Sequence, residues 1–159
     1  MTEATSTVEV DVPIRTAYNQ WTQFETFPEF MQGVKSVEQL DDTTTHWVFR
    51  LDGVKREFDA KIIEQEPDRH IEWFSIGELK QGGRVEFESL GEEKTRVTLT
   101  LKWEPEGFVE KAGEVLQVDD TLAAVDLRLF KAFIEKRGVE EGGWRGEIED
   151  GMVEADPNE

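Results

Sequence analysis

Two aspartates in the C-terminal half of the chain, Asp119 and Asp126, are the residues whose type and spacing could support chemistry. They lie seven residues apart in a segment of helical periodicity. Both therefore fall on one face of a helix, about 10 Å apart along its axis. The same face carries the apolar residues, so both carboxyl groups should point into the protein. A buried carboxylate is costly unless it is hydrogen-bonded, paired, hydrated or protonated.

Each aspartate therefore has two possible roles. It could tie the helix to a strand or to a tryptophan N–H, or it could serve in a cavity as a polar anchor or as a general acid or base. Asp119 lies nearer the end of the helix that should flank a cavity, and Asp126 lies nearer the packed end. If either residue is catalytic, we expect it to be Asp119.

Other kinds of chemistry find little support. The chain has no cysteine, which excludes disulfides, thiol nucleophiles and cysteine-bound metals. The two histidines, His46 and His70, have a spacing that matches no zinc motif, and we expect both at the surface or the sheet rim. Nucleophile elbows, phosphate loops and dinucleotide fingerprints are absent from the sequence. We predict no metal and no cofactor.

The charge balance limits the possible partners. The chain has 18 basic and 36 acidic residues, for a net charge of −18, which would repel nucleic acid and anionic lipid surfaces. Its apolar runs are far shorter than the roughly 20 residues that cross a bilayer, and residues 1–7 lack a secretory signal pattern. We expect a cytoplasmic protein without membrane insertion, either a monomer or a homodimer.

The elements that must position these residues follow from periodicity. Residues 5–12 alternate as a half-buried strand. Pro13 suits a helix start, and a second short helix should restart at Pro28. Six strands fit residues 34–104, where apolar residues alternate with charged ones and turn signals separate the runs. These signals are Asp41-Asp42, Asp52-Gly53, Pro67-Asp68, Gly82-Gly83 and Gly91-Glu92, with Asp52-Gly53 typical of a type I′ turn.

A long helix should cover the apolar face of this sheet. Pro105 precedes it and Gly138 follows it, so we place it from about residue 106 to Arg137. The predicted fold is α+β, with a seven-stranded curved antiparallel sheet wrapped around the C-terminal helix and two short helices between strands 1 and 2. We expect one domain over residues 1–138 and an acidic, solvated tail over 139–159, with Trp144 packed back on the body.

A helix laid across a curved sheet seldom fills the whole concavity, so we expect an apolar cavity between them. Taken singly, each aromatic residue is explained as well by core packing. The expected ligand-binding residues come from the short helices, the inward sheet face and the long helix: Trp21, Phe27, Phe30, Met31, Trp47, Phe49, Phe58, Trp73, Phe87, Val115, Asp119 and Leu122.

The order of elements, together with several local strings, resembles the polyketide cyclase/dehydrase family of the START-like (SRPBCC) superfamily. The strings are Val10–Pro13, Ala17–Trp21, Phe24–Val34, Gly53–Val54, Phe58–Ala60, Ile71–Trp73, Val85–Phe87, Thr95–Leu99, Asp126–Phe133 and Gly143–Gly146. The resemblance implies a helix-grip fold whose members hold lipids, sterols, polyketides or quinones between helix and sheet. No catalytic residue of this chain can be inferred from the resemblance, because the same cavity serves carriers, sensors and enzymes in the family.

Three functions stay open at this point. The leading hypothesis is a binding protein for a small hydrophobic molecule that is lipid-, quinone- or polyketide-like, with Asp119 orienting it. The second is a cyclase- or dehydratase-type enzyme with Asp119 as acid or base, for which Arg50, Arg56 and Arg84 are the cations that could reach a cavity rim. The third is a protein-interaction module, which would need an exposed apolar patch outside the cavity.

Overall fold

The computed structural model of the 159-residue chain describes residues 2–51, 53–77, 80–103 and 120–155. Within these ranges the chain forms nine strands, two α-helices and one 3-10 helix, in an order that begins with a strand and the short helices. The elements are β1 (Thr2–Val10), α1 (Ile14–Trp21), η1 (Phe24–Glu29), β2 (Val34–Gln39), β3 (Thr44–Leu51), β4 (Val54–Glu66), β5 (His70–Ile76), β6 (Gln81–Gly91), β7 (Lys94–Trp103), α2 (Asp120–Arg137), β8 (Glu147–Glu149) and β9 (Met152–Ala155).

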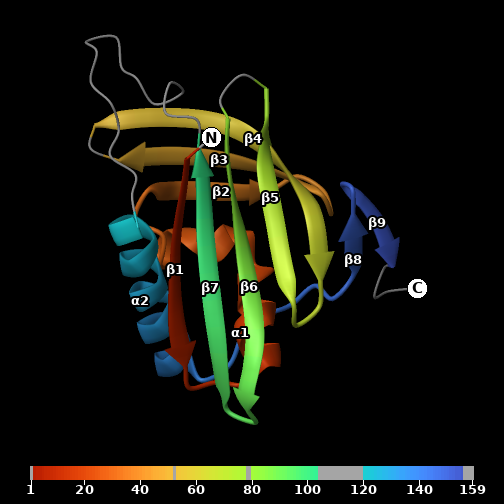
Figure 1. Cartoon of the computed structure of the whole chain (residues 1–159). Coiled ribbons are helices and arrows are strands. Elements are labelled where there is room, and N and C mark those ends of the chain that lie inside the picture. Colours follow the sequence, from red (N-terminus) through yellow and green to blue (C-terminus); the bar gives the residue numbers. More distant parts are fainter. Residues whose placement is uncertain (1, 52, 78–79, 104–119, 156–159) are drawn as a thin grey trace.

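The sheet is antiparallel and strongly curled. Its main path runs β1-β7-β6-β5-β4-β3-β2. The strands from β2 to β7 each pair with the next strand in the chain, and β1 pairs with β7. In Figure 1, β1, β7 and β6 run along the molecule, while β2 and β3 cross it near one end. The long strand β4 joins the two directions, and its register with β5 shifts between Ile62 and Glu64, as at a bulge. The seven predicted strands of the curved antiparallel sheet are confirmed, and β8 and β9 extend it to nine strands among the described residues.

Helix α2 packs on the concave side of this sheet, next to β1 (Figure 1). It ends where expected, because Gly138 has a positive φ of 73° and its N–H donates to the carbonyl oxygen of Ile134 at 2.8 Å. The α+β architecture with a C-terminal helix on a curved sheet is thus confirmed. The expected start of the helix near residue 106 lies outside the described residues. None of the helices in the described ranges is both long and apolar enough to span a membrane.

The two short helices fill the gap between β1 and β2. Helix α1 begins after Pro13, and its apolar positions place Ala17, Tyr18 and Trp21 inside the protein with no exposed surface. The second helix is the 3-10 helix η1, which contains Pro28 rather than beginning there. It therefore starts earlier than predicted, and this places Phe24 and Phe27 on its buried side.

One predicted turn is wrong. Gly82 and Gly83 lie inside β6, and the positive φ that marks the end of β5 is at Gly77, at 104°. The glycines serve a packing role instead. A Cβ built on Gly83 would lie 2.4 Å from Cζ2 of Trp73, so only a glycine lets this indole ring lie flat on the strand.

The C-terminal segment is more ordered than the acidic tail that its composition suggests. Strands β8 and β9 form a hairpin, and β8 pairs with β4 through Ile148 and Gln65. The physical reason is the alternation of Glu147, Ile148 and Glu149, which buries the isoleucine and leaves both glutamates in solvent. Trp144 is partly buried against the core, as predicted. The division of the chain at residue 138 stays a prediction.

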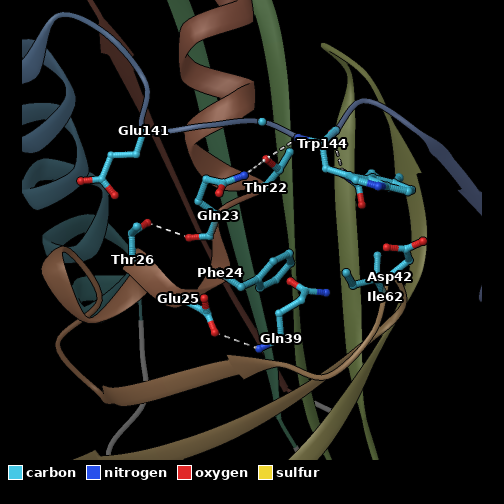
Figure 2. A pocket seen from close by; sticks show the side chains of 12 residues that line it. Thr22, Gln23, Phe24, Glu25, Thr26, Gln39, Asp42, Ile62, Glu141 and Trp144 are labelled. Carbon is cyan, nitrogen blue, oxygen red and sulfur yellow. Dashed lines mark hydrogen bonds between the residues drawn. The ribbon is translucent and has the colours of Figure 1, made fainter. Parts of the chain in front are cut away.

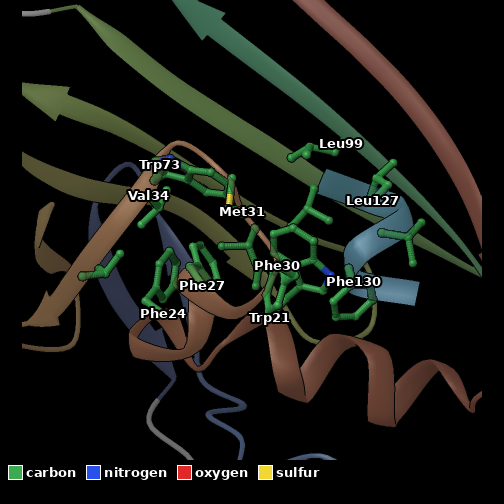
Figure 3. Close-up of a cluster of buried hydrophobic side chains, with 14 of the residues drawn as sticks. Trp21, Phe24, Phe27, Phe30, Met31, Val34, Trp73, Leu99, Leu127 and Phe130 are labelled. Atoms are coloured by element: carbon green, nitrogen blue, oxygen red, sulfur yellow. The ribbon is translucent and has the colours of Figure 1, made fainter. Parts of the chain in front are cut away.

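Aromatic side chains dominate the core (Figure 3). Four rings meet there: Trp21 from α1, Phe27 from η1, Phe30 directly after η1, and Phe130 from α2. The ring centroid of Trp21 lies 5.1 to 5.3 Å from those of the other three. Such edge-to-face and tilted contacts contribute about 0.5–1.5 kcal/mol each beyond the burial of area. This cluster joins both short helices to α2 and positions the elements around the space described below.

Candidate functional site

A small cavity lies between α2 and the curled sheet, and it is called the inner cavity here. It has a volume of about 50 Å³ and an apolar lining with few polar groups. It is lined by Met31, Gly33, Val34, Trp47, Phe49, Trp73, Gln81, Gly82, Leu101, Leu122 and Asp126. A second space of about 50 Å³ adjoins it toward the end of β7, because Phe49, Gln81, Gly82, Leu101 and Leu122 line both.

Two stacked indole rings, those of Trp47 and Trp73, form one wall of the inner cavity, and Phe58 packs behind them. Trp47 on β3 stacks on Trp73 with centroids 5.7 Å apart and on Phe58 with centroids 5.9 Å apart. The indole N–H of Trp47 donates to Oγ1 of Thr45 at 2.7 Å, which satisfies it inside the protein. Trp47 therefore contributes apolar ring atoms to the wall and leaves no unpaired hydrogen-bond donor there.

Asp126 is the acidic residue of the inner cavity. Its side chain is 2 % exposed, and its Oδ1 accepts a hydrogen bond of 3.1 Å from the backbone N–H of Gln32. Burial raises the pKa of Asp126 from 3.8 to about 7, and the hydrogen bond from Gln32 only partly opposes this. The carboxyl group is therefore close to half-protonated at neutral pH, so it can either donate or accept a proton there.

Gln81, at the start of β6, supplies the second polar group. Its backbone N–H donates to Oγ of Ser75 at 3.0 Å, which holds the start of the strand in place. Its side-chain Oε1 is buried and has no hydrogen-bond partner within the described ranges. Sequence reasoning missed this residue, because a glutamine at a strand start carries no signal of burial.

The inner cavity brings together some of the predicted ligand-binding residues. Met31, Trp47, Phe49, Trp73 and Leu122 line it. Trp21, Phe27 and Phe30 have no exposed surface and pack on one another instead. The structure places them in the core, because the short helices lie directly on α2 and leave no space between these rings.

The remaining predicted residues lie elsewhere. Phe58 stands behind the cavity wall on the far side of Trp47, and Phe87 makes an edge contact with Tyr18 of α1 at 5.4 Å. Val115 and Asp119 lie outside the described residues. Sequence reasoning gave Asp126 the smaller chance of a functional role, yet it is the aspartate that the structure places in the cavity lining.

None of the three arginines proposed for a cavity rim is among the described residues that line the inner cavity. Arg84 lies on the outer face of the sheet, where it contacts Glu72 at 2.6 Å, Glu64 at 3.2 Å and Glu86 at 3.3 Å. Alternation along β6 explains this, since Val85 and Phe87 occupy the inward positions. Arg50 is exposed, and Arg56 donates to the carbonyl oxygen of Lys55.

A larger and more open hollow lies beside η1, and it is called the outer groove here (Figure 2). Its volume is about 500 Å³, and its lining mixes amides and carboxylates with a few apolar rings. It is lined by Thr22, Gln23, Phe24, Glu25, Thr26, Gln39, Asp42, Ile62, Gln65, Glu141, Gly143 and Trp144. This composition suits water and polar groups better than an apolar ligand.

The C-terminal segment forms one side of the outer groove through polar contacts with α1 and the residues that follow it. The backbone N–H of Glu141 donates to Oε1 of Gln20 at 2.9 Å, and that of Trp144 donates to Oγ1 of Thr22 at 3.0 Å. Arg145 donates to Oδ1 of Asn19 at 2.7 Å and pairs with Asp68 at 2.8 Å. These contacts explain why buried polar residues occur on α1.

In the described part of the chain, His, Asp and Glu side chains do not gather in groups of three or more that could hold a metal ion. His46 contacts Asp59 across β3 and β4 at 2.7 Å, and His70 lies 3.4 Å from Glu64. Both histidines are placed on the sheet surface, away from the inner cavity.

With this fold and this cavity, the chain belongs to the polyketide cyclase/dehydrase and lipid transport family, whose model matches residues 10–127. It is 48 % identical over 149 residues to an uncharacterized 17.2 kDa protein from the melC2-rnhH intergenic region of Streptomyces lincolnensis. The match covers 93 % of this chain and 99 % of that relative.

Solved structures agree with the fold. Protein DR_A0006 from Deinococcus radiodurans has a TM-score of 0.70 at 23 % identity, covering 86 % of this chain and 99 % of that one. The Zhui aromatase/cyclase from Streptomyces sp. R1128 has a TM-score of 0.66 at 14 % identity, covering 89 % and 98 %. A START superfamily protein from Mycobacterium smegmatis has a TM-score of 0.60 at 19 % identity, covering 85 % and 95 %. The START-like fold is therefore shown.

Proposed function

We propose that this protein binds a small hydrophobic molecule in the inner cavity, between α2 and the sheet. The observation that carries the proposal is the lining of this cavity, in which aromatic and aliphatic side chains surround the carboxyl group of Asp126. A mostly apolar site with few polar groups is typical of small-molecule binding, with the apolar surface providing affinity and the polar groups orientation. Membership of a family that includes lipid transport supports the same class of ligand.

The proposal assigns the orienting role to Asp126. The sequence pattern favours Asp119 for this role, but Asp119 lies outside the described residues, so its role stays a prediction. Asp126 meets the structural requirements of an anchor, because it is buried, lies among the cavity residues and is held by one backbone hydrogen bond from Gln32. Among the described residues, Gln32 is its hydrogen-bond partner, and a carboxyl group can make further hydrogen bonds to a ligand.

Retention of a ligand during purification tests this proposal. Native mass spectrometry and solvent extraction of the purified protein should reveal a bound apolar compound. Trp73→Ala, which removes part of the wall, and Leu122→Phe, which fills the space, should both reduce the bound fraction severalfold. Trp144→Ala is the matched control, because Trp144 lines the outer groove and should leave retention unchanged. Equal retention in Trp73→Ala, Leu122→Phe and the unchanged protein would rule out the inner cavity.

A second candidate function is an enzyme of the cyclase or dehydratase type, and one observation favours it. The pKa of Asp126, raised to about 7 by burial, matches the working range of a general acid or base at neutral pH. Its test is turnover of a polyketide-like substrate. Asp126→Asn should abolish turnover while preserving binding, and the wild-type rate should depend on pH with an apparent pKa near 7. Full turnover by Asp126→Asn would exclude this role.

The protein-interaction hypothesis has weaker support. The exposed large apolar residues belong to separate elements, including Leu40 after β2, Ile76 on β5 and Met152 on β9. Scattered residues of this kind are normal on a protein surface. A cytoplasmic location and a monomeric or homodimeric state remain predictions from the sequence.

A further inference from the structure

The outer groove is acidic, and its described lining residues include no counter-charge. Three carboxylates line it, those of Glu25, Asp42 and Glu141, without a lysine, arginine or histidine among the described lining residues. Arg137 lies 3.1 Å from Glu141 and balances that charge. Glu25 accepts one long hydrogen bond of 3.4 Å from the backbone N–H of Gln39, and within the described ranges neither Glu25 nor Asp42 forms an ion pair. Two carboxylates of the groove therefore lack a cation.

A buried acceptor distinguishes this groove from the rest of an acidic surface. Gln65 on β4 lines the groove with 2 % of its surface exposed, and its Nε2 donates to the carbonyl oxygen of Trp144 at 3.4 Å. The donor side of the amide is thus engaged, while Oε1 is buried and has no partner within the described ranges. Tyr18 on α1 interacts with the same side chain, but its hydroxyl group also lies outside hydrogen-bonding geometry. A buried acceptor is unfavourable without a donor, so Oε1 of Gln65 favours a ligand that brings one.

Aromatic surface lies beside these acceptors. Phe24 and Trp144 line the groove, and in the view of Figure 2 the indole ring of Trp144 lies at the same end as Asp42. The face of an indole ring attracts a cation, and a planar guanidinium group can stack on it. The groove volume of about 500 Å³ is in the range of small-molecule sites. Negative charge, a buried acceptor and an aromatic ring thus occur together in one hollow.

We propose that the outer groove is a second binding site, which takes an organic cation with a primary ammonium or guanidinium group. Glu25 and Asp42 supply the opposite charge, Oε1 of Gln65 accepts one N–H group, and the ring of Trp144 covers an apolar side of the ligand. A free polyamine and a lysine or arginine side chain of a partner protein present the same chemistry. The site is separate from the inner cavity and does not rest on the function proposed above.

Titration with small probes tests the site. The reporter is the indole N–H signal of Trp144 in nuclear magnetic resonance spectra, identified by its absence in Trp144→Phe. Butylguanidinium should shift this signal, whereas butanol and butyrate, which have a similar chain without the positive charge, should not. The affinity for butylguanidinium should fall as sodium chloride is raised from about 0.05 M to about 0.5 M, because salt screens the charges. Spermidine and a capped tripeptide with a central arginine distinguish the two sources, and the tighter of them identifies the natural one.

Variants locate the site in the groove. Asp42→Asn should weaken butylguanidinium binding about two- to fivefold, as expected for one partly exposed ion pair. Gln65→Met keeps the length of the side chain but removes the acceptor, and it should weaken binding about tenfold. Glu57→Gln is the matched control for net charge, because Glu57 is exposed and is not among the residues that line the groove. It should leave the affinity unchanged.

Three results would overturn the proposal. The first is a Trp144 signal that butylguanidinium does not shift, and the second is butanol or butyrate binding as tightly as the cation. The third is equal weakening by Asp42→Asn and Glu57→Gln, which would mean that the cation follows the net charge of −18 and not the groove. Retention of an apolar compound by the inner cavity is measured separately, so neither proposal depends on the result of the other.

Discussion

The carboxyl group of Asp126 and the backbone N–H of Gln32 are joined by a hydrogen bond of 3.1 Å that links α2 to the segment between η1 and β2. The two residues are 94 positions apart in the chain. This bond anchors a buried acidic group at the edge of the inner cavity. The same group therefore affects both the stability of the fold and the chemistry of the site.

Asp126→Asn should change how stability depends on pH. The folded-state pKa of Asp126 is raised from 3.8 to about 7, so the folded protein keeps this proton between those values while the unfolded chain releases it. Stability from this group is therefore complete below pH 3.8 and is lost as pH rises toward 7. At about 1.4 kcal/mol per pH unit, the free energy of unfolding of the wild type should fall by about 3 kcal/mol relative to the variant between roughly pH 5 and 8.

Urea unfolding at several pH values measures this difference. Comparing the two proteins cancels the titration of the other acidic groups, which they share. Parallel stability curves for wild type and Asp126→Asn would show that Asp126 titrates at its ordinary pKa in the folded state.

Gly83→Ala should destabilise the protein by about 1–3 kcal/mol, because the added Cβ must displace the Trp73 ring. The Cβ would lie 2.4 Å from Cζ2 of Trp73. Gly91→Ala, on the same strand, is the control, since nothing lies within 4 Å of a Cβ at that position. Thermal unfolding of both variants tests the prediction, and equal melting temperatures would contradict the close packing of Trp73 on β6.

Thr45→Val should cost about 1–3 kcal/mol despite its nearly unchanged shape, because it removes the acceptor of the buried Trp47 N–H. Oγ1 of Thr45 lies 2.7 Å from Nε1 of Trp47. Thr7→Val serves as the control, since the Thr7 hydroxyl group pairs with that of Thr98 on an exposed face, where water can replace it. Chemical denaturation reports the difference, and a loss no larger in Thr45→Val than in Thr7→Val would count against the buried bond.

Ile148→Ala should destabilise the protein by about 2–4 kcal/mol, as expected for a truncation in a packed core. Ile148 is 4 % exposed, whereas Val153 on the neighbouring strand is 37 % exposed and provides the control variant Val153→Ala. Denaturant titrations of both measure the effect. If residues 139–159 behaved as an unattached tail, neither substitution would change the midpoint.

The sequence alone indicated the elements up to Gly138 and their order, but not the hairpin of β8 and β9. Alternation predicted β1 to β7, and the Pro13 and Gly138 signals predicted where α1 begins and α2 ends. These features depend on contacts between residues close in the chain, so they leave a periodic pattern. The same periodicity predicted that Asp126 faces inward, and its exposure of 2 % agrees.

Only the tertiary structure decided which inward residues surround a space and which fill the core. Trp21, Phe27 and Phe30 carry the same apolar signal as Trp47 and Trp73. The first three pack on one another, and Trp21 and Phe30 also contact Phe130, whereas Trp47 and Trp73 line the inner cavity. Likewise, the pair Gly82-Gly83 predicted a turn, but in the tertiary structure both glycines pack against Trp73. Such outcomes depend on the curl of the sheet and on side chains far apart in sequence, which a local pattern does not encode.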